Sequence, residues 1–295
     1  MARTAEQVEV DGRRFELSNP DKLLYPDDGH SKRDLLEYAR SVAEVMVPHM
    51  RGKPLTMRRF PDGVGSDGFF QKEASEHFPD WVRVEPVPQR GADSPVHHVF
   101  CDDAATLAYL ATQAVLEFHI GLSTADDLDK PVLVVLDLDP PEGQDLGQLR
   151  AVVREMCRRF GEAGLSPRVQ STGGKGFHVV APLRGERGFD DVRAAIRELA
   201  EQAAADDPDR LTTEQRKDRR GDRIYLDTNR NAYGQTMIAP YSPRARAGAP
   251  VATPLDPKEL SRASPQGHDL TSIPRRLPRK PDPWADLHHD ATDFG

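Results

Sequence analysis

The chain has 295 residues, of which 37% are hydrophobic and 30% are charged, and its formal net charge is -8. This length allows one large domain or two modest ones with a real hydrophobic core. The negative charge argues against a protein that coats nucleic acid through bulk charge, although a local basic channel is compatible with it. The two cysteines, Cys101 and Cys157, have no metal-binding spacing and predict a reduced, intracellular protein. No apolar run approaches about 18 residues and the N-terminus lacks a hydrophobic signal segment, so we expect a cytoplasmic protein without a membrane span.

The first predicted elements are a β-hairpin and a helix. Residues 8–19 form two alternating runs around an Asp-Gly pair, which predicts a hairpin whose glycine adopts a positive φ. A capping box and apolar residues at helical spacing predict a helix over residues 31–49. Its first turn carries Lys32 and Arg33, which oppose the helix dipole unless an anion such as a phosphate binds there. A solvated helix end is the alternative interpretation.

A strand and an aromatic pair follow. Residues 52–60 predict a strand that places Arg58 and Arg59 on opposite faces. A glycine-rich loop then leads to Phe69 and Phe70. This pair, next to a lysine, fits either a base-stacking platform or a loop that anchors itself in the core, and the pattern taken alone favours the anchor.

The segment before the central strand is predicted as loop, strand and helix. Residues 85–95 are rich in proline and glycine and predict a loop, and residues 96–100 predict a strand. Apolar residues at helical spacing predict a helix over residues 104–118. His119 would close that helix at the negative end of its dipole, where a structural role and a functional role are equally compatible with the pattern.

Residues 131–139 are an apolar, valine-rich run that ends in two carboxylates. The run predicts a buried central strand, terminated by the prolines that follow it. Because side chains alternate along a strand, Asp137 and Asp139 point to the same face. Two carboxylates this close repel, so in a partly dry site they share a proton or bind a divalent cation. An acidic surface turn is the alternative interpretation.

A glycine-rich turn lies between two predicted strands after an amphipathic helix near residues 146–160. Residues 171–176 contain three glycines, two hydroxyls and Lys175, and His178 follows in the second strand. Backbone N–H groups of such a turn can converge on phosphate oxygens. The segment lacks the residues of a Walker A loop or a dinucleotide fingerprint. A plain hairpin turn is the alternative, but it does not explain Lys175 and His178 together.

The last third of the chain predicts one more acidic strand end. A helix is expected from about Phe189 to before Pro208, and residues 216–223 form a basic patch with five cations. The short apolar strand after this patch ends in Asp227, a third carboxylate. Residues 270–295 lose periodicity and predict an extended, packed or disordered tail.

Taken in their order and spacing, eight motifs and segments resemble one family. They resemble the polymerase domain of bacterial DNA ligase D, within the archaeo-eukaryotic primase superfamily, over roughly residues 19–260. The motifs are NPDK from Asn19, the RRF and FFQK segments, EFH from Glu117, DLDP from Asp137, TGGKGFH from Thr172, RIYLD ending at Asp227, and APYSPRARAGAPVATPL from Ala239.

The resemblance implies an α+β fold, with a primase-like catalytic core of mixed and antiparallel sheets flanked by helices. It implies a single primase-polymerase domain over 1–295, with a part that binds DNA and its 5'-phosphate up to about residue 130. The catalytic core would follow from about 131 to 260, with an extended tail from about 270. Asp137, Asp139 and Asp227 would be the catalytic residues and would hold two divalent ions, Mn²⁺ or Mg²⁺.

The resemblance also implies roles in substrate binding. Lys22 and Lys32 match a pocket for the 5'-phosphate on the downstream side of a gap, and Phe69 and Phe70 match an aromatic pair that stacks on the template and the incoming base. The expected nucleotide-binding residues, which the resemblance assigns to one shared ligand, are Arg58, Phe70, His119, Thr172, Gly174, Lys175, Gly176, His178 and Arg244.

The implied function is template-directed nucleotidyl transfer that fills short gaps or ends in non-homologous end joining and often inserts ribonucleotides. The implied substrates are DNA with a 5'-phosphate and NTPs or dNTPs, with Ku and a separate ATP-dependent DNA ligase as candidate partners near the bacterial nucleoid. Thr172 replaces the family's common serine, and Ile120-Gly121 replaces a Pro-Trp pair after the histidine. Because the sequence contains no ligase Lys-x-Asp-Gly motif, we expect a stand-alone polymerase or an excised domain.

Three other functions share part of this residue pattern. A haloacid-dehalogenase-type phosphatase needs Thr or Val where this chain has Pro141. A non-catalytic module that binds 5'-phosphorylated ends has no use for three carboxylates beside DNA, because they repel its backbone. A primase that starts chains de novo is the closest alternative within the family.

Overall fold

A computed structural model describes residues 5–294 of the protein and divides them into two compact units. Unit 1 comprises residues 5–121, 238–252 and 268–282, and unit 2 comprises residues 122–237, 253–267 and 283–294. Both contain helices and largely antiparallel sheets, so the predicted α+β fold class is confirmed. The prediction that the whole chain acts as one primase-polymerase domain stays a prediction.

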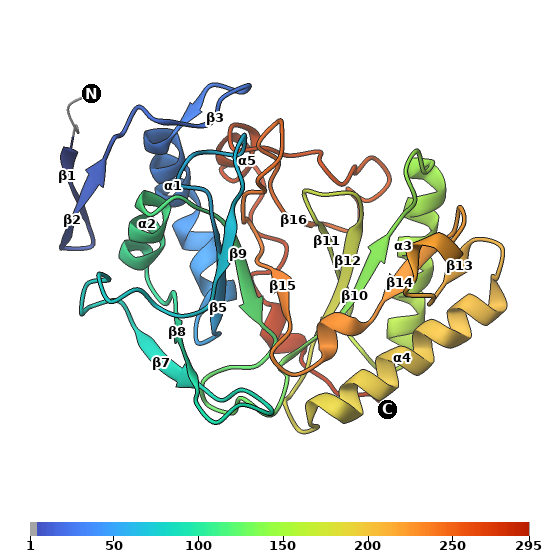
Figure 1. Ribbon diagram of the computed structural model, residues 1–295. Helices are drawn as coiled ribbons and strands as arrows, with labels where there is room; N and C mark the ends of the chain where they lie inside the picture. The colour runs from blue at the N-terminus through green and yellow to red at the C-terminus, as the bar shows by residue number, and fades with distance from the viewer. Residues whose placement is uncertain (1–4, 295) are drawn as a thin grey trace. The chain divides into compact units, whose positions relative to one another are not determined.

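Unit 1 is built around a four-stranded sheet with strand order β15-β9-β5-β6, of which β15 joins the two units along the chain. Helices α1 and α2 pack against each other, and α2 also packs against β9 (Figure 1). Its elements are β1 (Ala5–Val10), β2 (Arg13–Ser18), β3 (Leu23–Tyr25), β4 (His30–Ser31), α1 (Lys32–Met50), β5 (Leu55–Arg59), β6 (Phe69–Gln71), β7 (Val84–Val87), β8 (Val96–Val99), α2 (Ala104–Thr112), β9 (Val115–Gly121), β15 (Thr236–Ile238) and α5 (Ser272–Arg276).

The first two sequence predictions are confirmed by local chemistry. β1 and β2 pair as an antiparallel hairpin, and Asp11 and Gly12 take φ values of 48° and 74° at its turn. Helix α1 begins after Ser31, whose hydroxyl accepts from the Asp34 N–H while the Asp34 carboxylate accepts from the Ser31 N–H. These bonds satisfy two of the groups that a helix leaves unpaired at its start, which is why the helix begins there.

The predicted helix over residues 104–118 is wrong in its second half. Helix α2 stops at Thr112, Ala114 has φ +56°, and residues from Val115 onwards form strand β9. Helical spacing misled the prediction because the apolar residues after Ala114 are buried on both faces of a sheet. His119 therefore lies inside a strand, opposite Thr56 of β5, and does not close a helix.

Two further segments contain strands that the sequence did not predict. Part of the 85–95 loop belongs to β7, which pairs with β8. Phe69 and Phe70 lie in β6, at the edge of the sheet beside β5. The interpretation that one ring anchors a loop in the core is wrong, since the two residues are 47% and 63% exposed.

Unit 2 is built around a six-stranded sheet with strand order β13-β14-β10-β12-β11-β16, in which all neighbours are antiparallel except β13 and β14. Figure 1 shows α3 and α4 beside this sheet. The elements are β10 (Leu133–Asp139), α3 (Leu146–Glu162), β11 (Arg168–Ser171), β12 (Phe177–Pro182), α4 (Phe189–Asp206), β13 (Leu211–Thr212), η1 (Lys217–Arg219), β14 (Ile224–Asp227), η2 (Asn229–Asn231), β16 (Thr253–Leu255) and η3 (Leu287–Asp290).

One face of this sheet forms the hydrophobic core of unit 2. Leu136 and Leu138 of β10 alternate with the two aspartates and pack in one buried cluster with Val153 of α3 and Ile196 of α4. Both helices therefore cover the face opposite the carboxylates. The prediction of a buried central strand is confirmed, since β10 has neighbours on both sides.

The C-terminal segment is packed down as far as Phe294. It contributes α5 to unit 1 and η3 to unit 2, and the side chains of Trp284 and Leu287 are buried. Among residues 5–294, none of the helices combines the length and apolarity that crossing a bilayer requires.

Candidate active site

The three predicted catalytic aspartates lie on one face of the unit 2 sheet. β10 and β14 pair so that Asp137 stands directly opposite Asp227, and Asp139 stands opposite Tyr225. Directly opposed residues of antiparallel strands project to the same face with Cβ atoms about 5 Å apart. His178 of β12 is the partner of Asp137 on its other side. The register therefore brings a histidine and two carboxylates into one row, with the third carboxylate two residues along.

The loop after Asp227 is held against the edge of β10. Beyond the short β14, the Val135 N–H donates to Asn231 Oδ1 at 2.9 Å, and Asn231 Nδ2 donates to the Val135 carbonyl at 2.6 Å. The buried Asn231 amide thus replaces a strand neighbour for one residue of β10. This contact fixes the position of the preceding residue, Arg230.

Each aspartate in the row has a partner within unit 2. Asp137 lies 3.6 Å from His178 Nε2 and 3.5 Å from Arg230 Nε, and Asp139 accepts from Arg220 Nη1 at 3.0 Å. Burial opposes ionisation of Asp137, but His178 and Arg230 offset it, so the pKa of Asp137 lies below its ordinary value. Asp137 is therefore ionised at neutral pH, and arginines lie beside both Asp137 and Asp139.

Asp227 is oriented by its own strand end. Its Oδ1 accepts from the Asn229 N–H at 2.8 Å and from the Tyr225 hydroxyl at 3.3 Å. Burial and the Asp227 charge raise the pKa of Tyr225 to about 12, so the phenol stays protonated and donates. The Arg220 guanidinium lies over the Tyr225 ring at 3.7 Å.

The donor set of the acidic row fits a hard divalent cation. Carboxylate oxygens on adjacent strands are the ligands that Mg²⁺ and Mn²⁺ prefer. The side chains are turned toward arginine, however, and no group of three or more His, Cys, Asp and Glu within residues 5–294 is arranged to hold a metal ion. The residues present therefore fit divalent ions in chemistry, whereas in this structure Arg220 and Arg230 pair with Asp139 and Asp137. The metal assignment stays a prediction.

The glycine-rich turn between β11 and β12 packs tightly against β10. A Cβ on Gly176 would lie 1.8 Å from the Leu138 carbonyl oxygen, so only glycine fits there. Thr172 Oγ1 donates to the Gly176 carbonyl at 2.9 Å and accepts from the Gly174 N–H at 3.1 Å. The Gly173 N–H donates to the Pro265 carbonyl. Two N–H groups of the predicted phosphate nest are therefore used within the protein, and Thr172 holds the turn in shape.

His178 is a buried residue with one ring nitrogen that is unpaired within residues 5–294. Its Nε2 faces Asp137, while its Nδ1 is buried and has no hydrogen-bond partner in the described part of the chain. A buried ring nitrogen without a partner is costly, which indicates a ligand. The predicted nucleotide-binding role of His178 is compatible with this unpaired nitrogen.

Four residues of unit 1 form a charged cluster around one buried carboxylate. Glu117 is 1% exposed and lies opposite Arg58 in the β5–β9 pairing. Its Oε2 accepts from Arg58 Nη1 at 3.4 Å and from His119 Nε2 at 3.1 Å, and its Oε1 accepts from Arg244 Nε at 3.1 Å. Arg58, His119 and Arg244 were predicted as nucleotide-binding residues, and the structure brings them together. We call these four residues the Glu117 cluster.

Sequence reasoning assigned no role to Glu117, although it belongs to the EFH motif. Residues two apart share a face in a strand but not in a helix. The mistaken helix over residues 104–118 therefore hid the relation between Glu117 and His119. Arg230 was also missed, and no local pattern distinguishes it from other surface arginines.

The aromatic pair lies next to the Glu117 cluster. Phe70 packs edge-on against His119 with ring centroids 5.7 Å apart, and the Arg58 guanidinium lies 5.3 Å from its ring. Phe69 points to the other face of β6, where Arg59 lies 5.7 Å from its ring. Two exposed rings backed by cations are suited to stacking on nucleic acid bases.

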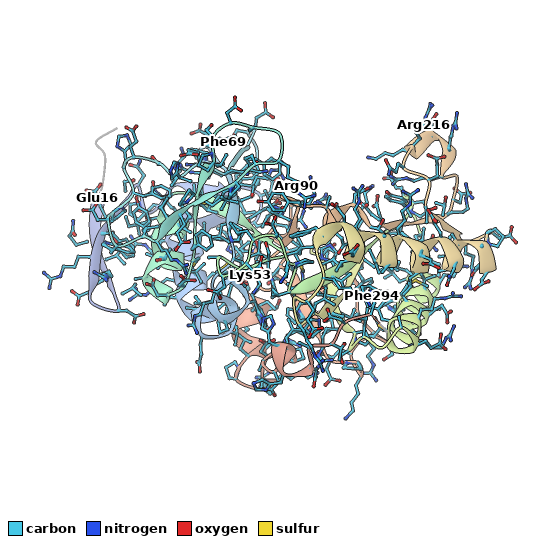
Figure 2. The ribbon with its side chains drawn as sticks, turned by 90° about the horizontal axis from the view of Figure 1, so that it is seen from below. Glu16, Lys53, Phe69, Arg90, Arg216 and Phe294 are labelled. Atoms are coloured by element: carbon cyan, nitrogen blue, oxygen red, sulfur yellow. The ribbon has the colours of Figure 1, made fainter. Side chains whose placement is uncertain are left out.

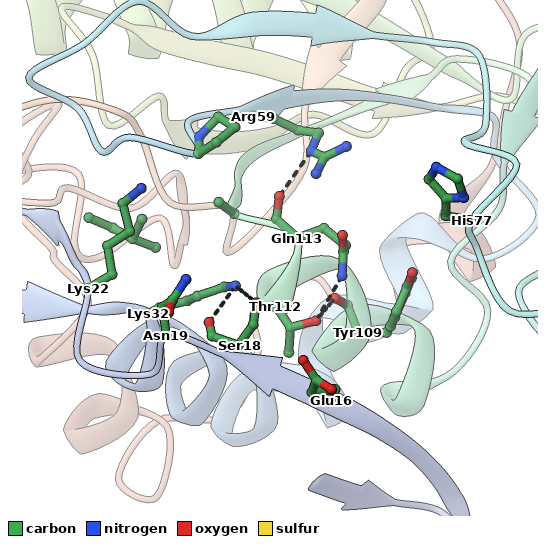
Figure 3. A pocket seen from close by; sticks show the side chains of 13 residues that line it. Glu16, Ser18, Asn19, Lys22, Lys32, Arg59, His77, Tyr109, Thr112 and Gln113 are labelled. Atoms are coloured by element: carbon green, nitrogen blue, oxygen red, sulfur yellow. Dashed lines mark hydrogen bonds between the residues drawn. The ribbon is translucent and has the colours of Figure 1, made fainter. Parts of the chain in front are cut away.

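Unit 1 also contains a cavity of about 490 Å³, and both lysines predicted to bind the 5'-phosphate, Lys22 and Lys32, line it. Figure 3 shows Lys22, Lys32 and Asn19 on one side of this cavity and His77 on the opposite side. Lys32 Nζ donates to the Ser18 carbonyl at 2.9 Å, and Lys22 Nζ lies 2.6 Å from the exposed Asp62. Arg59 also lines the cavity and was not predicted there. Three cations in one concave site favour an anionic ligand.

The basic patch of unit 2 lies on the segment between β13 and β14. Figure 2 shows Arg216 projecting from this segment, on its outer side. Arg220 from the same segment reaches back to Asp139. The patch therefore contributes one of the cations that neutralise the acidic row.

The predicted nucleotide ligands are divided between the units. Arg58, Phe70, His119 and Arg244 belong to unit 1, whereas the glycine-rich turn and His178 belong to unit 2. The expectation that both sets bind one nucleotide stays a prediction.

Comparison with known proteins agrees with this geometry. The family model described as LigD, primase-polymerase domain, matches residues 31–284. The chain belongs to the LigD primase-polymerase domain family. Members of this family are nucleotidyltransferases of the primase-polymerase type, and the enzyme class predicted from the sequence is confirmed.

Relatives of this LigD-family chain include longer repair proteins. It is 31% identical over 280 residues to the multifunctional non-homologous end joining protein LigD of Mycolicibacterium smegmatis, covering 94% of this chain and 36% of the relative. It is 28% identical over 282 residues to the bifunctional protein LigD of Bacillus subtilis, covering 95% and 45%. The chain thus spans less than half the length of these curated relatives.

A solved structure covers the same region. The polymerase domain from Mycobacterium tuberculosis ligase D in complex with DNA superposes with a TM-score of 0.86 and 30% sequence identity. The match covers 93% of this chain and 98% of that domain. It supports the predicted primase-like fold class over nearly all of the chain.

Proposed function

We propose that this chain catalyses template-directed addition of nucleotides to a primer 3'-hydroxyl and fills short gaps at DNA ends during non-homologous end joining. The observation that carries the proposal is the register of β10 and β14, which sets Asp227 opposite Asp137 on the face that also carries Asp139. Membership of the LigD family and similarity to a domain solved with DNA support the choice of substrate.

Asp137, Asp139 and Asp227 would hold two divalent ions, Mn²⁺ or Mg²⁺. Bound ions would neutralise the triphosphate and acidify the primer hydroxyl. The protein's own contribution is to hold the carboxylates side by side, while His178 and Tyr225 orient Asp137 and Asp227. Metal binding competes with Arg220 and Arg230, so the acidic row stays partly neutralised before loading.

The nucleotide phosphates would be bound by Lys175, by His178, whose Nδ1 lacks a hydrogen-bond partner within residues 5–294, and by the turn that Thr172 shapes. The Glu117 cluster offers a second cationic site for a nucleotide, next to the Phe70 ring. In neither site does a side chain have to act as a nucleophile, because phosphoryl transfer depends mainly on positioning and charge.

The cavity with Lys22 and Lys32 would bind the 5'-phosphate on the downstream side of the gap. Such a 5'-phosphate belongs to a strand that is already paired with the template. A site that binds it therefore favours gap filling over synthesis on a bare single-stranded template. We further propose that the protein works near the bacterial nucleoid with Ku and a separate ATP-dependent ligase, and that it inserts ribonucleotides readily.

A primer-extension assay tests the proposal. The substrate is a duplex with a short gap and either a 5'-phosphate or a 5'-hydroxyl downstream, supplied with NTPs or dNTPs and with Mn²⁺, Mg²⁺ or EDTA. We expect templated addition that EDTA abolishes and that the 5'-phosphate increases. Absence of addition on every substrate would refute the proposal. Efficient synthesis on single-stranded template without a primer would favour the de novo primase instead.

A further inference from the structure

The strongest observation outside the predicted sites is the position of Glu117. Its buried carboxylate accepts four hydrogen bonds, two from arginine side chains, one from His119 and one from the Ala245 N–H at 3.0 Å. Burial alone would favour the neutral form, but these hydrogen bonds and charges hold the pKa of Glu117 far below its ordinary range. Glu117 is therefore a fixed negative charge beneath two arginines and a histidine.

Glu117 is unsuited to contact a nucleotide itself. It is buried, and a carboxylate repels phosphate. The side chains that surround it are more accessible, with 33% of Arg58, 16% of Arg244 and 13% of His119 exposed, compared with 2% of the Glu117 side chain. The Glu117 carboxylate is thus buried, whereas the side chains of Arg58, His119 and Arg244 remain partly exposed.

The backbone around Arg244 is already held in place. The Tyr25 hydroxyl donates to the Arg244 carbonyl at 3.0 Å, and the Arg244 N–H donates to the Pro250 carbonyl at 2.8 Å. In addition, Ser242 Oγ accepts from the Phe118 N–H of β9 at 2.9 Å. The Glu117 bond to Arg244 Nε then restricts the long side chain as well.

The same carboxylate also restricts Arg58. Arg58 Nη1 is bound to Glu117, while its Nε is buried and has no hydrogen-bond partner among residues 5–294. Its guanidinium lies between the rings of Phe60, at 4.9 Å, and Phe70, at 5.3 Å. An arginine oriented on one edge by a carboxylate presents its other donors in a fixed direction.

We propose that Glu117 is a positioning residue that orients Arg58, His119 and Arg244 as one preformed site for the phosphates of the incoming nucleotide. This inference rests on the proposed function and adds a residue to it. Fixing these three side chains before binding removes the entropy cost of ordering them when the nucleotide arrives. Loss of Glu117 is therefore expected to weaken nucleotide binding and to leave DNA binding unchanged.

The test compares Glu117→Gln and Glu117→Asp with the natural protein. Glutamine keeps the shape but loses the charge and places an amide N–H₂ against cationic donors, so we expect the KM for ATP to rise about tenfold with kcat changed less than about threefold. Aspartate keeps the charge, so the KM of Glu117→Asp for ATP should lie between those of the natural protein and Glu117→Gln. Direct binding of a non-hydrolysable ATP analogue, followed by fluorescence without a primer, should weaken by the same factor.

Glu155→Gln is the matched control. Glu155 also binds two arginines, Arg158 and Arg159, but on the surface of α3 in unit 2. We expect its KM and analogue binding to match those of the natural protein. Thermal unfolding shows whether each variant is folded. If Glu117→Gln is not folded, nucleotide binding by Glu117→Asp is compared with that of the natural protein instead.

A double-mutant cycle separates positioning from general damage. If Glu117 acts through Arg244, then Glu117→Gln should cost less than about threefold in analogue affinity once Arg244→Gln is present. The inference is overturned if the full tenfold loss persists in that background, or if both Glu117 variants bind the analogue normally. Failure of the natural protein to add nucleotides to gapped DNA would instead refute the proposed function.

Discussion

The acidic row of unit 2 and the Glu117 cluster of unit 1 each combine carboxylates with two arginines and a histidine, but they differ in the number of carboxylates. The acidic row sets three carboxylates against Arg220, Arg230 and a histidine. The Glu117 cluster sets one carboxylate against two arginines and a histidine. One region has a deficit of positive charge and the other a surplus, so the first suits cations and the second suits phosphate.

The two regions also differ in which groups are accessible. The Asp139 side chain is 42% exposed, whereas the Glu117 side chain is 2% exposed. In the proposed function the carboxylates of the acidic row bind metal ions, whereas the Glu117 carboxylate orients the side chains that bind the nucleotide. Motif searches find the first kind of residue easily, because it is the residue that touches the substrate.

The largest effect is expected in the acidic row, for Asp137→Asn. The variant keeps the shape but removes one negative charge from the row opposite Asp227, so nucleotide addition should fall on the order of 10³-fold. DNA affinity, measured by fluorescence anisotropy, should stay within about twofold. Asp209→Asn, at an exposed aspartate of unit 2, is the control. More than about a tenth of normal activity in Asp137→Asn would remove this residue from the catalytic set.

The next effect concerns the cationic cavity of unit 1. The double variant Lys22→Ala with Lys32→Ala removes two of the cations that line it. The preference for a downstream 5'-phosphate over a 5'-hydroxyl should fall by about 10 to 100-fold. The slope of log DNA affinity against log salt concentration should decrease in magnitude by the equivalent of up to about two phosphate contacts. Arg14→Ala, an exposed cation of β2, is the control. A preference that survives both substitutions would place the phosphate elsewhere.

A smaller effect is expected from the turn that packs on the acidic row. Thr172→Ala removes the hydroxyl that bridges Gly174 and Gly176, so the KM for nucleotide should rise about tenfold while DNA affinity stays the same. Thr172→Ser keeps the bridge and should behave like the natural protein. Equal KM values for the alanine and serine variants would show that the bridge has no part in binding.

The smallest effect tests how unit 1 tolerates a buried cation. Lys53, labelled in Figure 2, is 2% exposed, and burial lowers its pKa from 10.5 to about 8 although Asp102 favours the charged form. Between these pH values the unfolded chain binds the extra proton, so stability should rise with pH across that window. Lys53→Met should abolish the rise and increase the apparent Tm at pH 7 by a few degrees. Lys130→Met, at an exposed lysine, should do neither.

Local patterns predicted much of this molecule correctly. The hairpin at Asp11, the start of α1 at Ser31 and the buried strand that ends in two aspartates follow from turn, cap and alternation chemistry, which involve residues close in the chain. The prediction failed at β9, because burial on both faces of a sheet imitates helical spacing. That failure removed Glu117 from consideration.

The sequence by itself therefore determined which residues are chemically capable, namely the aspartates at strand ends, the glycine-rich turn and the cations of the family motifs. Only the tertiary structure decided which of them meet: Asp227 with Asp137, Asn231 with the edge of β10, and Arg244 with Glu117. The physical reason is that capping and alternation act over a few residues. Strand pairing and buried charge compensation join residues that are distant along the chain, and no local pattern encodes their partner.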